Sequence, residues 1–442
     1  MFQTFKNAWK TPDLKRKILF TIMVLLLYRI GATISVPYVN TVLLETISFS
    51  GTALEFLSMF SGGAMAQASF FALSVSPYIT ASIVMQLLTI AIPALEKLSK
   101  EGDEGKKKIT KYTRIVTVGL AIITAWGYVR LLSSYNGLNY LTVSKADGFM
   151  YYFAMIVMIA CYCAGAAIVM WLAEQINAYG VGNGISMILF ANIIAGFTMT
   201  VTEMYYMVIS ETEVWGYVLA GVKILLSVLL TIAAVGFIVW FTNSERRIPI
   251  QYAKRVVGRK MYGGQSSNLP LKLNMAGVMP VIFASSIVAI PATIAGLTGS
   301  KGAVATWITE WLGQTSPLYI ALNVILIVAF SYFYIMISFN PVEVANNIRN
   351  QGGSIPGIRP GKPTSDYIKK ILNRITLLGA IFLLVIQVVP MIANAIFVAC
   401  KISFPSIAFT GTSLLIVVGV ALEVVRDIEA QLAMRNYKGF LD

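Results

Sequence analysis

The stretch KLSKEGDEGKKKITKYTRIVTVGLAIITAWGYVRLL (97–132) places a strongly basic segment directly before an apolar one. Lys97–Arg114 holds seven Lys and Arg residues, whereas Ile115–Leu132 holds one charged residue, Arg130. An apolar helix of roughly 20 residues crosses the hydrocarbon core of a bilayer. Loops rich in Lys and Arg stay on the cytoplasmic side. The stretch therefore predicts a cytoplasmic loop that leads into a membrane-spanning helix.

The same alternation runs along all 442 residues and predicts ten membrane-spanning helices. The apolar stretches are 18–36, 70–92, 115–132, 149–172, 185–201, 214–241, 276–297, 318–339, 375–398 and 407–425. Of the 34 Lys and Arg residues, 28 lie in the N-terminus, the C-terminus and the loops 97–114, 246–272 and 349–374. The other set of loops holds four. We expect both termini in the cytoplasm and the first span to be retained rather than cleaved as a signal peptide.

The composition agrees with this interpretation, because 57% of the residues are hydrophobic and only 12% are charged. Soluble domains carry about 25% charged residues. In lipid, backbone polar groups must pair within the protein, so the predicted fold is an all-α polytopic bundle. An even division gives five spans per half, and an odd number per half makes the second half enter from the opposite side. The halves would then be inverted repeats.

Missing residue types narrow the function classes. The chain has no His and only three Cys, of which Cys161 and Cys163 point to different faces of one helix. We therefore expect no metal, no cofactor and no enzyme activity. Gly357–Pro363 is not a phosphate-binding loop, because its glycine spacing differs and Pro363 stands where Ser or Thr would bind magnesium. A secondary transporter, the main alternative class, usually places ionisable groups at mid-membrane, and none is visible in these spans.

Two regions each allow two interpretations. Residues 40–69 contain an apolar run at 52–66 that is too short to span, and this run includes Gly62 and Gly63. They could form an interfacial helix or a re-entrant segment that stops a pore. The long basic loops could serve only topology and attraction to anionic lipid, or they could dock an acidic partner such as ribosomal RNA or an ATPase. Their length favours docking, since topology alone does not need it.

Several long motifs resemble the SecY family of bacterial protein-translocation channels. They are MFSGGAMAQASFFALSVSPYITASIVMQLL (59–88), WLAEQINAYGVGNGISMILFANI (171–193), QYAKR (251–255), LPLKLNMAGVMPVIFASSI (269–287), NPVEVANNIRNQGGSIPGIRPGKPTSDYI (340–368) and GTSLLIVVGVALE (411–423). The resemblance covers essentially the whole chain. It implies a clamshell of two pseudo-symmetric halves, 1–210 and 211–442, hinged between the fifth and sixth spans, with cytoplasmic loops at about 243–276 and 340–374.

The resemblance also assigns roles to individual positions. The implied pore ring is Ile79, Ile83, Ile185, Leu189, Ile282 and Ile416. Family members mostly carry Ile where this chain has Leu189, which keeps an aliphatic side chain of similar volume. The implied plug, within 52–65, includes Thr52, Leu54, Phe56, Leu57, Phe60, Gly62 and Gly63. The implied lateral gate includes Thr80, Ser82, Gln86, Ser285 and Ser286. The implied contacts for the SecA motor or the ribosome are Arg246, Arg247, Lys254, Arg255 and Arg359.

The function implied by the resemblance is passage of unfolded secretory proteins across the bacterial cytoplasmic membrane, with sideways release of transmembrane segments into lipid. SecA or the translating ribosome would supply the energy. The expected partners are the small subunits SecE and SecG, SecA, the ribosome, polypeptides that carry signal sequences, and membrane lipid.

Overall fold

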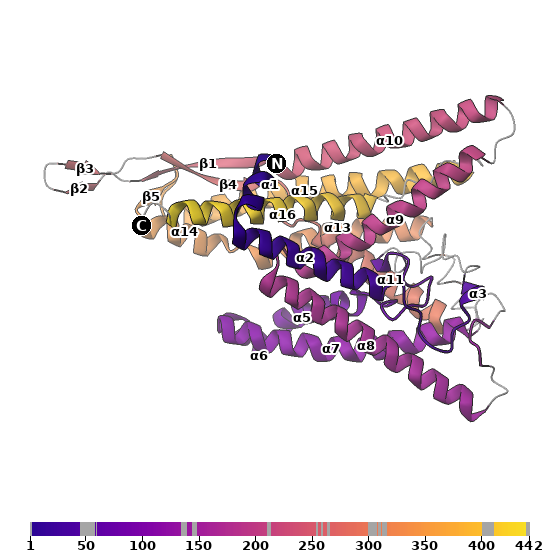
Figure 1. Cartoon of the computed structure of the whole chain (residues 1–442). Helices are drawn as coiled ribbons and strands as arrows, with labels where there is room; N and C mark the ends of the chain where they lie inside the picture. The colour runs from indigo at the N-terminus through magenta and orange to yellow at the C-terminus, as the bar shows by residue number, and fades with distance from the viewer. Residues whose placement is uncertain are drawn as a thin grey trace.

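The computed structural model describes residues 2–44, 58, 60–133, 139–143, 148–209, 214–252, 255–257, 260–262, 266–298, 307, 311, 316–399 and 411–438. Long helices form an elongated bundle with their axes roughly aligned, and both termini lie at one end of it (Figure 1). Each predicted apolar stretch overlaps one of ten long helices. These are α2 (Pro12–Gly31), α5 (Ser76–Ala91), α7 (Asp103–Leu132), α8 (Phe149–Tyr179), α9 (Gly184–Ile209), α10 (Val214–Asn243), α11 (Met279–Thr298), α13 (Pro317–Ser338), α15 (Lys362–Ala399) and α16 (Gly411–Lys438).

Length and composition identify part of this set as membrane-spanning. Within the described residues, five helical stretches are long and apolar enough to cross a bilayer: 103–132, 149–179, 216–243, 317–350 and 362–393. A sixth is the pair α5 and α6 (Pro93–Lys100), which bends by 101°. Short helices complete the described part: α1 (Phe2–Lys10), α3 (Thr41–Leu44) and α14 (Pro341–Asn350). The chain is therefore a multi-pass membrane protein.

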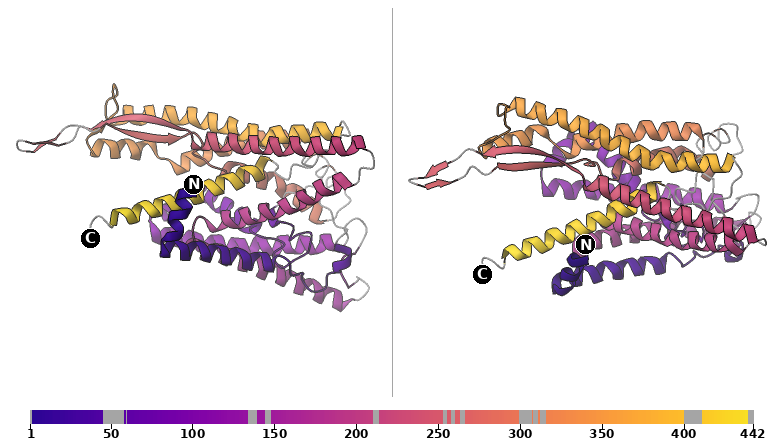
Figure 2. Two further views of the ribbon diagram at one scale, coloured as in Figure 1. Left: turned by 45° about the horizontal axis from the view of Figure 1, so that its top comes forward. Right: turned by 90° about the horizontal axis from the view of Figure 1, so that it is seen from above.

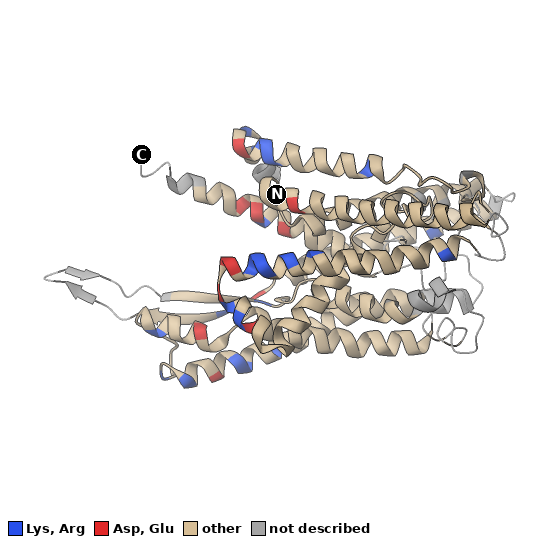
Figure 3. Ribbon diagram, turned by 90° about the horizontal axis from the view of Figure 1, so that it is seen from below, with Lys and Arg blue, Asp and Glu red and all other residues tan. Residues whose placement is uncertain are grey.

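Charged side chains gather at the end of the bundle that holds the termini (Figure 3). The same end carries strands that extend beyond the helices (Figures 1 and 2). This distribution follows from the sequence, because the basic loops alternate with nearly uncharged ones. The described structure thus gathers the basic loops at one end of the bundle.

The strands are β1 (Glu245–Tyr252), β2 (Arg255–Val257), β3 (Lys260–Tyr262), β4 (Ser266–Lys272) and β5 (Gly353–Ser354). β1 pairs antiparallel with β4 and β5 in the order β4-β1-β5, and β2 pairs with β3. The all-α prediction is wrong for this part of the chain. Along β1, Ile248 and Ile250 are buried while their neighbours are exposed, which is the period-two pattern of a half-buried strand.

Helices near each other in sequence pack together, and a central core joins them. α7 contacts α5 and α8, and α13 contacts α11 and α15. Contacts between the first five and the last five long helices join α9 to both α10 and α16, and α11 to both α5 and α7. The loop 210–213, implied as the hinge, lies outside the described residues.

The second predicted span starts later than expected. Its helix begins at Ser76, with Pro77 in the first turn, where proline fits because the helix leaves that N–H unpaired anyway. Residues 60–75 before it, here called the stem segment, are mostly turns. Their backbone has positive φ at Gly62 and Gly63, and also at Ala68 and Ser74. An apolar helix is the natural interpretation of this sequence, but the enclosing helices hold its backbone in another shape.

One glycine lets a helix touch this segment. An added Cβ at Gly165 of α8 would lie 1.8 Å from the carbonyl oxygen of Phe70. By contrast, a Cβ at Gly119 of α7 would meet nothing within 4 Å. The close approach of α8 to the stem segment therefore depends on a missing side chain.

We expect Gly165→Ala to destabilise the fold by about 1–3 kcal/mol, the usual effect of overpacking a core. Gly119→Ala should be neutral or stabilising, because alanine has the higher helix propensity. Thermal unfolding of the two variants in the same detergent provides the measurement. Equal melting temperatures would show that the stem segment adapts to the added methyl group.

Candidate pore, stem segment and cytoplasmic module

Six aliphatic side chains from four helices belong to the main hydrophobic core of the described residues. Ile79 and Ile83 are one turn apart on α5, as are Ile185 and Leu189 on α9, so each pair faces one side. Ile282 of α11 and Ile416 of α16 complete the set. All six belong to one hydrophobic cluster, in which Ile185 is partly exposed and the other five are buried. The structure thus brings the predicted ring residues together.

This cluster joins the two groups of five helices without any hydrogen bond from the six side chains. The first group of helices contributes Ile79, Ile83, Ile185 and Leu189, and the second group contributes Ile282 and Ile416. Aliphatic side chains hold such a contact by burial alone and form no directional bonds. Separation of the two groups at this point would break no polar interaction.

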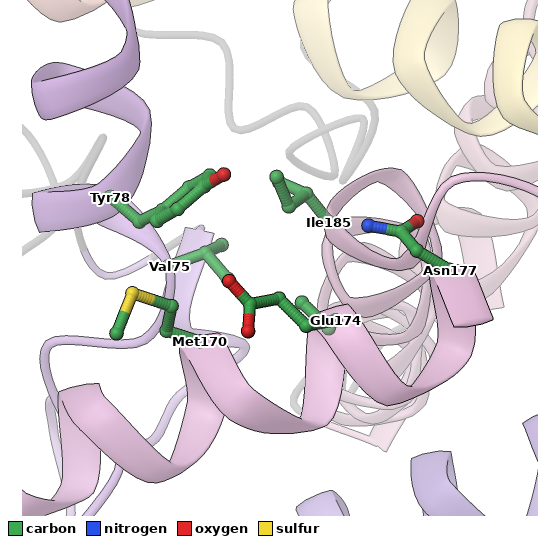
Figure 4. A pocket seen from close by; sticks show the side chains of 7 residues that line it. Val75, Tyr78, Met170, Glu174, Asn177 and Ile185 are labelled. Atoms are coloured by element: carbon green, nitrogen blue, oxygen red, sulfur yellow. The ribbon is translucent and has the colours of Figure 1, made fainter. Parts of the chain in front are cut away.

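A pocket of about 220 Å³ lies beside Ile185, between α5, α8 and α9 (Figure 4). Its lining residues are Val75, Tyr78, Met170, Ala173, Glu174, Asn177 and Ile185. Glu174 Oε1 accepts a hydrogen bond from Arg114 Nε of α7 at 2.7 Å. The sequence does not reveal this ion pair, because its two residues are 60 positions apart.

The stem segment includes the described part of the predicted plug. Phe60 is buried in the same hydrophobic cluster as the ring. Gly62 lies against α9 and α2, and its carbonyl oxygen is 3.5 Å from a guanidinium nitrogen of Arg29. Gly63 follows with a positive φ and open space around it. The predicted plug residues Thr52, Leu54, Phe56 and Leu57 lie outside the described residues.

The predicted gate residues lie on α5 and α11, two helices that contact each other. On α5, Ser82 and Gln86 are half-buried, and Thr80 Oγ1 donates to the Ser76 carbonyl of its own helix at 3.1 Å. On α11, Ser286 is half-buried. Ser285 is 1% exposed, and its hydroxyl has no hydrogen-bond partner among the described residues. A buried hydroxyl without a hydrogen-bond partner costs free energy.

The two long basic loops form a single folded unit, here called the cytoplasmic module. β5 of the second loop pairs with β1 of the first, Ser354 opposite Gln251 and Gly353 opposite Tyr252. A separate core joins them to α14 and α15, formed by Ile248, Ile250, Leu271, Ile348, Ile355, Ile368 and Ile375. No sequence pattern predicts that the two loops pack together.

Exposed arginines lie on the surface of this module. Arg246 and Arg247 are exposed on β1, and Arg247 Nε donates to Glu245 Oε1 at 2.7 Å. Arg359 is exposed on the second loop, and its carbonyl accepts from Thr364 Oγ1 at 2.8 Å. Arg255 begins β2, and Lys254 lies outside the described residues. The part of the chain that the structure describes has no cluster of metal-ligating side chains.

Comparisons with known proteins agree on one family. The SecY family model matches residues 69–425. The chain is 45% identical over its full length to the protein translocase subunit SecY of Streptomyces coelicolor, and 42% identical to that of Bacillus subtilis, in each case covering 100% of both chains.

Solved structures of protein-conducting channels share the fold. The structure titled "The structure of a protein conducting channel" has a TM-score of 0.64 at 18% identity and covers 94% of this chain and 92% of its own. Two others have a TM-score of 0.59 and the same coverages. One, at 19% identity, is titled for the plug domain of the SecY protein that stabilises the closed state and maintains a membrane seal. The other, at 17% identity, is Sec61 in the canine ribosome-channel complex.

Proposed function

The chain belongs to the SecY family, and from this premise we propose that it is the central protein-conducting channel of a bacterial Sec translocon. Unfolded secretory proteins pass through it across the cytoplasmic membrane, and both of its termini are cytoplasmic. The observation that supports this most directly is that six aliphatic side chains from both groups of helices belong to one hydrophobic core cluster. The two groups correspond to the proposed halves 1–210 and 211–442.

The physical task explains why the ring is aliphatic. A resting channel must exclude ions, and a narrow apolar constriction does so by remaining dry. A passing polypeptide presents every kind of side chain. Ile and Leu at the ring can yield to each without offering hydrogen bonds that would hold it. The channel therefore performs no chemistry, and SecA or the ribosome supplies the energy.

The helices that carry the ring also border the proposed path by which a transmembrane segment leaves sideways into lipid. We infer that α5 and α7 separate from α11 and α13 to open a path into lipid, past Thr80, Ser82, Gln86, Ser285 and Ser286. A sufficiently apolar segment leaves through this path by partition, since Leu, Ile, Phe and Val favour the bilayer interior.

The cytoplasmic module is the proposed docking surface for SecA and the ribosome. Its exposed arginines, Arg246, Arg247 and Arg359, are suited to carboxylates and phosphates, which guanidinium groups bind with paired hydrogen bonds. Lys254 and Arg255 belong to the same proposed surface. SecE and SecG are the proposed small membrane partners. A solved relative in a ribosome-channel complex supports the ribosome as a partner.

Reconstitution tests this function directly. Proteoliposomes that contain the purified chain with its co-purifying small subunits should take up a radiolabelled precursor when SecA and ATP are added. Protease protection measures the uptake. Absence of uptake with active SecA, or uptake of a small solute driven by an ion gradient, would contradict the proposal and favour a transporter.

For the ring, we expect the double variant Ile83→Ser and Ile282→Ser to be expressed normally but to leak ions at rest. Both side chains are at most 5% exposed, and serine removes apolar volume and admits water. Planar-bilayer recordings should show a several-fold rise in resting conductance. Ile381→Ser on the exposed face of α15 is the matched control and should stay sealed. Equal conductance of the double variant and the wild type would overturn the ring assignment.

For the docking surface, we expect Arg359→Lys to lower SecA-driven uptake and Arg359→Glu to lower it by about tenfold. An ammonium group cannot replace the paired hydrogen bonds of a guanidinium group, and loss of a charged hydrogen bond weakens binding by that order. Gly357 and Gly361 flank the arginine with positive φ, which fixes its backbone. Precursor uptake and SecA ATPase activity in proteoliposomes are the measurements.

Arg349→Glu, on the exposed surface of the adjoining α14, controls for the change of charge alone. Insertion and orientation of every variant should be normal. If Arg359→Glu retained full activity at saturating SecA, the loop would be only a topology signal.

A further inference from the structure

One polar side chain shares the ring-bearing face of α9. Ile185, Leu189 and Asn192 are spaced by four and three residues, so they lie on one face of the helix. Asn192 is 0% exposed and lies one turn beyond the ring, toward the proposed outer side. A buried amide in an apolar cluster costs free energy unless its hydrogen bonds are made. Its partners therefore indicate what it does.

Both partners of the Asn192 amide nitrogen belong to the stem segment. Asn192 Nδ2 donates to the Phe60 carbonyl at 2.7 Å and to Ser74 Oγ at 3.0 Å. Ser74 Oγ donates to the same Phe60 carbonyl at 3.2 Å. Tyr28 OH of α2 lies 3.0 Å from Ser74 Oγ. Two side chains, Asn192 and Ser74, thus donate to one backbone carbonyl, and Tyr28 joins the network through Ser74.

Every donor of this network has an acceptor, whereas Asn192 Oδ1 accepts no hydrogen bond among the described residues. If Tyr28 donates to Ser74, each N–H and O–H in it has one acceptor, and the Phe60 carbonyl accepts two bonds, one for each lone pair. Tyr28, Ser74, Asn192 and Phe60 are all at most 3% exposed. Loss of one donor would leave a buried carbonyl or hydroxyl with fewer partners than it can use.

The backbone geometry shows how tightly the segment is held. Gly62 has φ +60°, and a Cβ there would lie 2.9 Å from both Cα and the carbonyl oxygen of Asn192. Ser74 has φ +47°, a conformation that a non-glycine residue adopts only at a cost. The stem segment therefore contacts α9 near its own beginning, at Gly62, and has a strained backbone near its own end, at Ser74.

We propose that Asn192 is a positioning residue that fixes the stem segment against α9 and so keeps the channel closed above its ring. The inference rests on the proposed channel function. Outward movement of Phe60–Gly63 requires the Asn192 amide to release the Phe60 carbonyl. The ring excludes ions by its apolar surface, whereas Asn192 sets how readily the segment beyond the ring leaves its closed position.

The test compares Asn192→Leu with Asn323→Leu, because Asn323 is an equally buried amide. Asn323 lies on α13, and its described hydrogen bond runs from Nδ2 to the Tyr319 carbonyl of its own helix. Ser74→Gly is a second variant. It removes the hydroxyl but accepts a positive φ without strain, so it keeps the fold if Asn192→Leu does not. All are studied with the full chain and its co-purifying subunits.

The first readout is hydrogen exchange of peptides that cover residues 60–75. Loss of the network should raise their exchange rate by about tenfold in Asn192→Leu and Ser74→Gly. Asn323→Leu should leave that rate unchanged. Wild-type exchange in both network variants, or equal acceleration in Asn323→Leu, would overturn the proposal.

The second readout is function. The two network variants should show a several-fold rise in resting conductance, and they should take up a precursor with a defective signal sequence. Asn323→Leu should do neither. Resting conductance and signal selectivity equal to wild type in both network variants would also overturn the proposal. The proposed channel function is tested separately, by precursor uptake with the wild type. The exchange comparison does not depend on uptake, so the two proposals can fail independently.

Discussion

The need to pair every backbone polar group away from water determines the architecture of this protein. Long helices satisfy the requirement within themselves. The stem segment cannot, because its backbone is not helical, and it therefore depends on side chains of the surrounding helices. Tyr128 donates to the Met65 carbonyl, Tyr162 to the Ala68 carbonyl and Asn192 to the Phe60 carbonyl. α7, α8 and α9 each supply one donor, so the segment is held by the helices that enclose it.

Because buried backbone groups must be paired, neighbouring turns of α9 carry side chains with different functions. Leu189 contributes apolar surface to the hydrophobic cluster that holds the proposed ring. Asn192, one turn later, supplies the directional bonds that fix an irregular backbone. A polar group at the ring would hold water and ions, and an apolar residue at position 192 would leave the Phe60 carbonyl with one donor fewer. Adjacent turns therefore require opposite chemistry.

The sequence predicts the helices well because the membrane imposes their length and composition, and the charge of the loops predicts which end is cytoplasmic. It does not predict the stem segment, since Phe70–Val75 is as apolar as the helix that follows. The ring residues were assigned by resemblance. The spacing of Ile79 and Ile83 shows a shared face but not what that face meets. Asn192 was missed because a single asparagine in an apolar run resembles ordinary helix packing.

The strands were missed for a related reason, and their position matters for function. β1 has a proline, Pro249, and pairs with β5, a strand of two residues about 100 positions away. Pairing between strands so far apart leaves no local sequence pattern from which the strands could be predicted. Yet β1 directly follows α10, and residues 273–278 alone join β4 to α11, the helix that carries Ile282. The backbone amide of Leu273 also donates to the Ser244 carbonyl at 2.9 Å. The proposed docking surface is therefore continuous, through a short and hydrogen-bonded connection, with a helix of the ring.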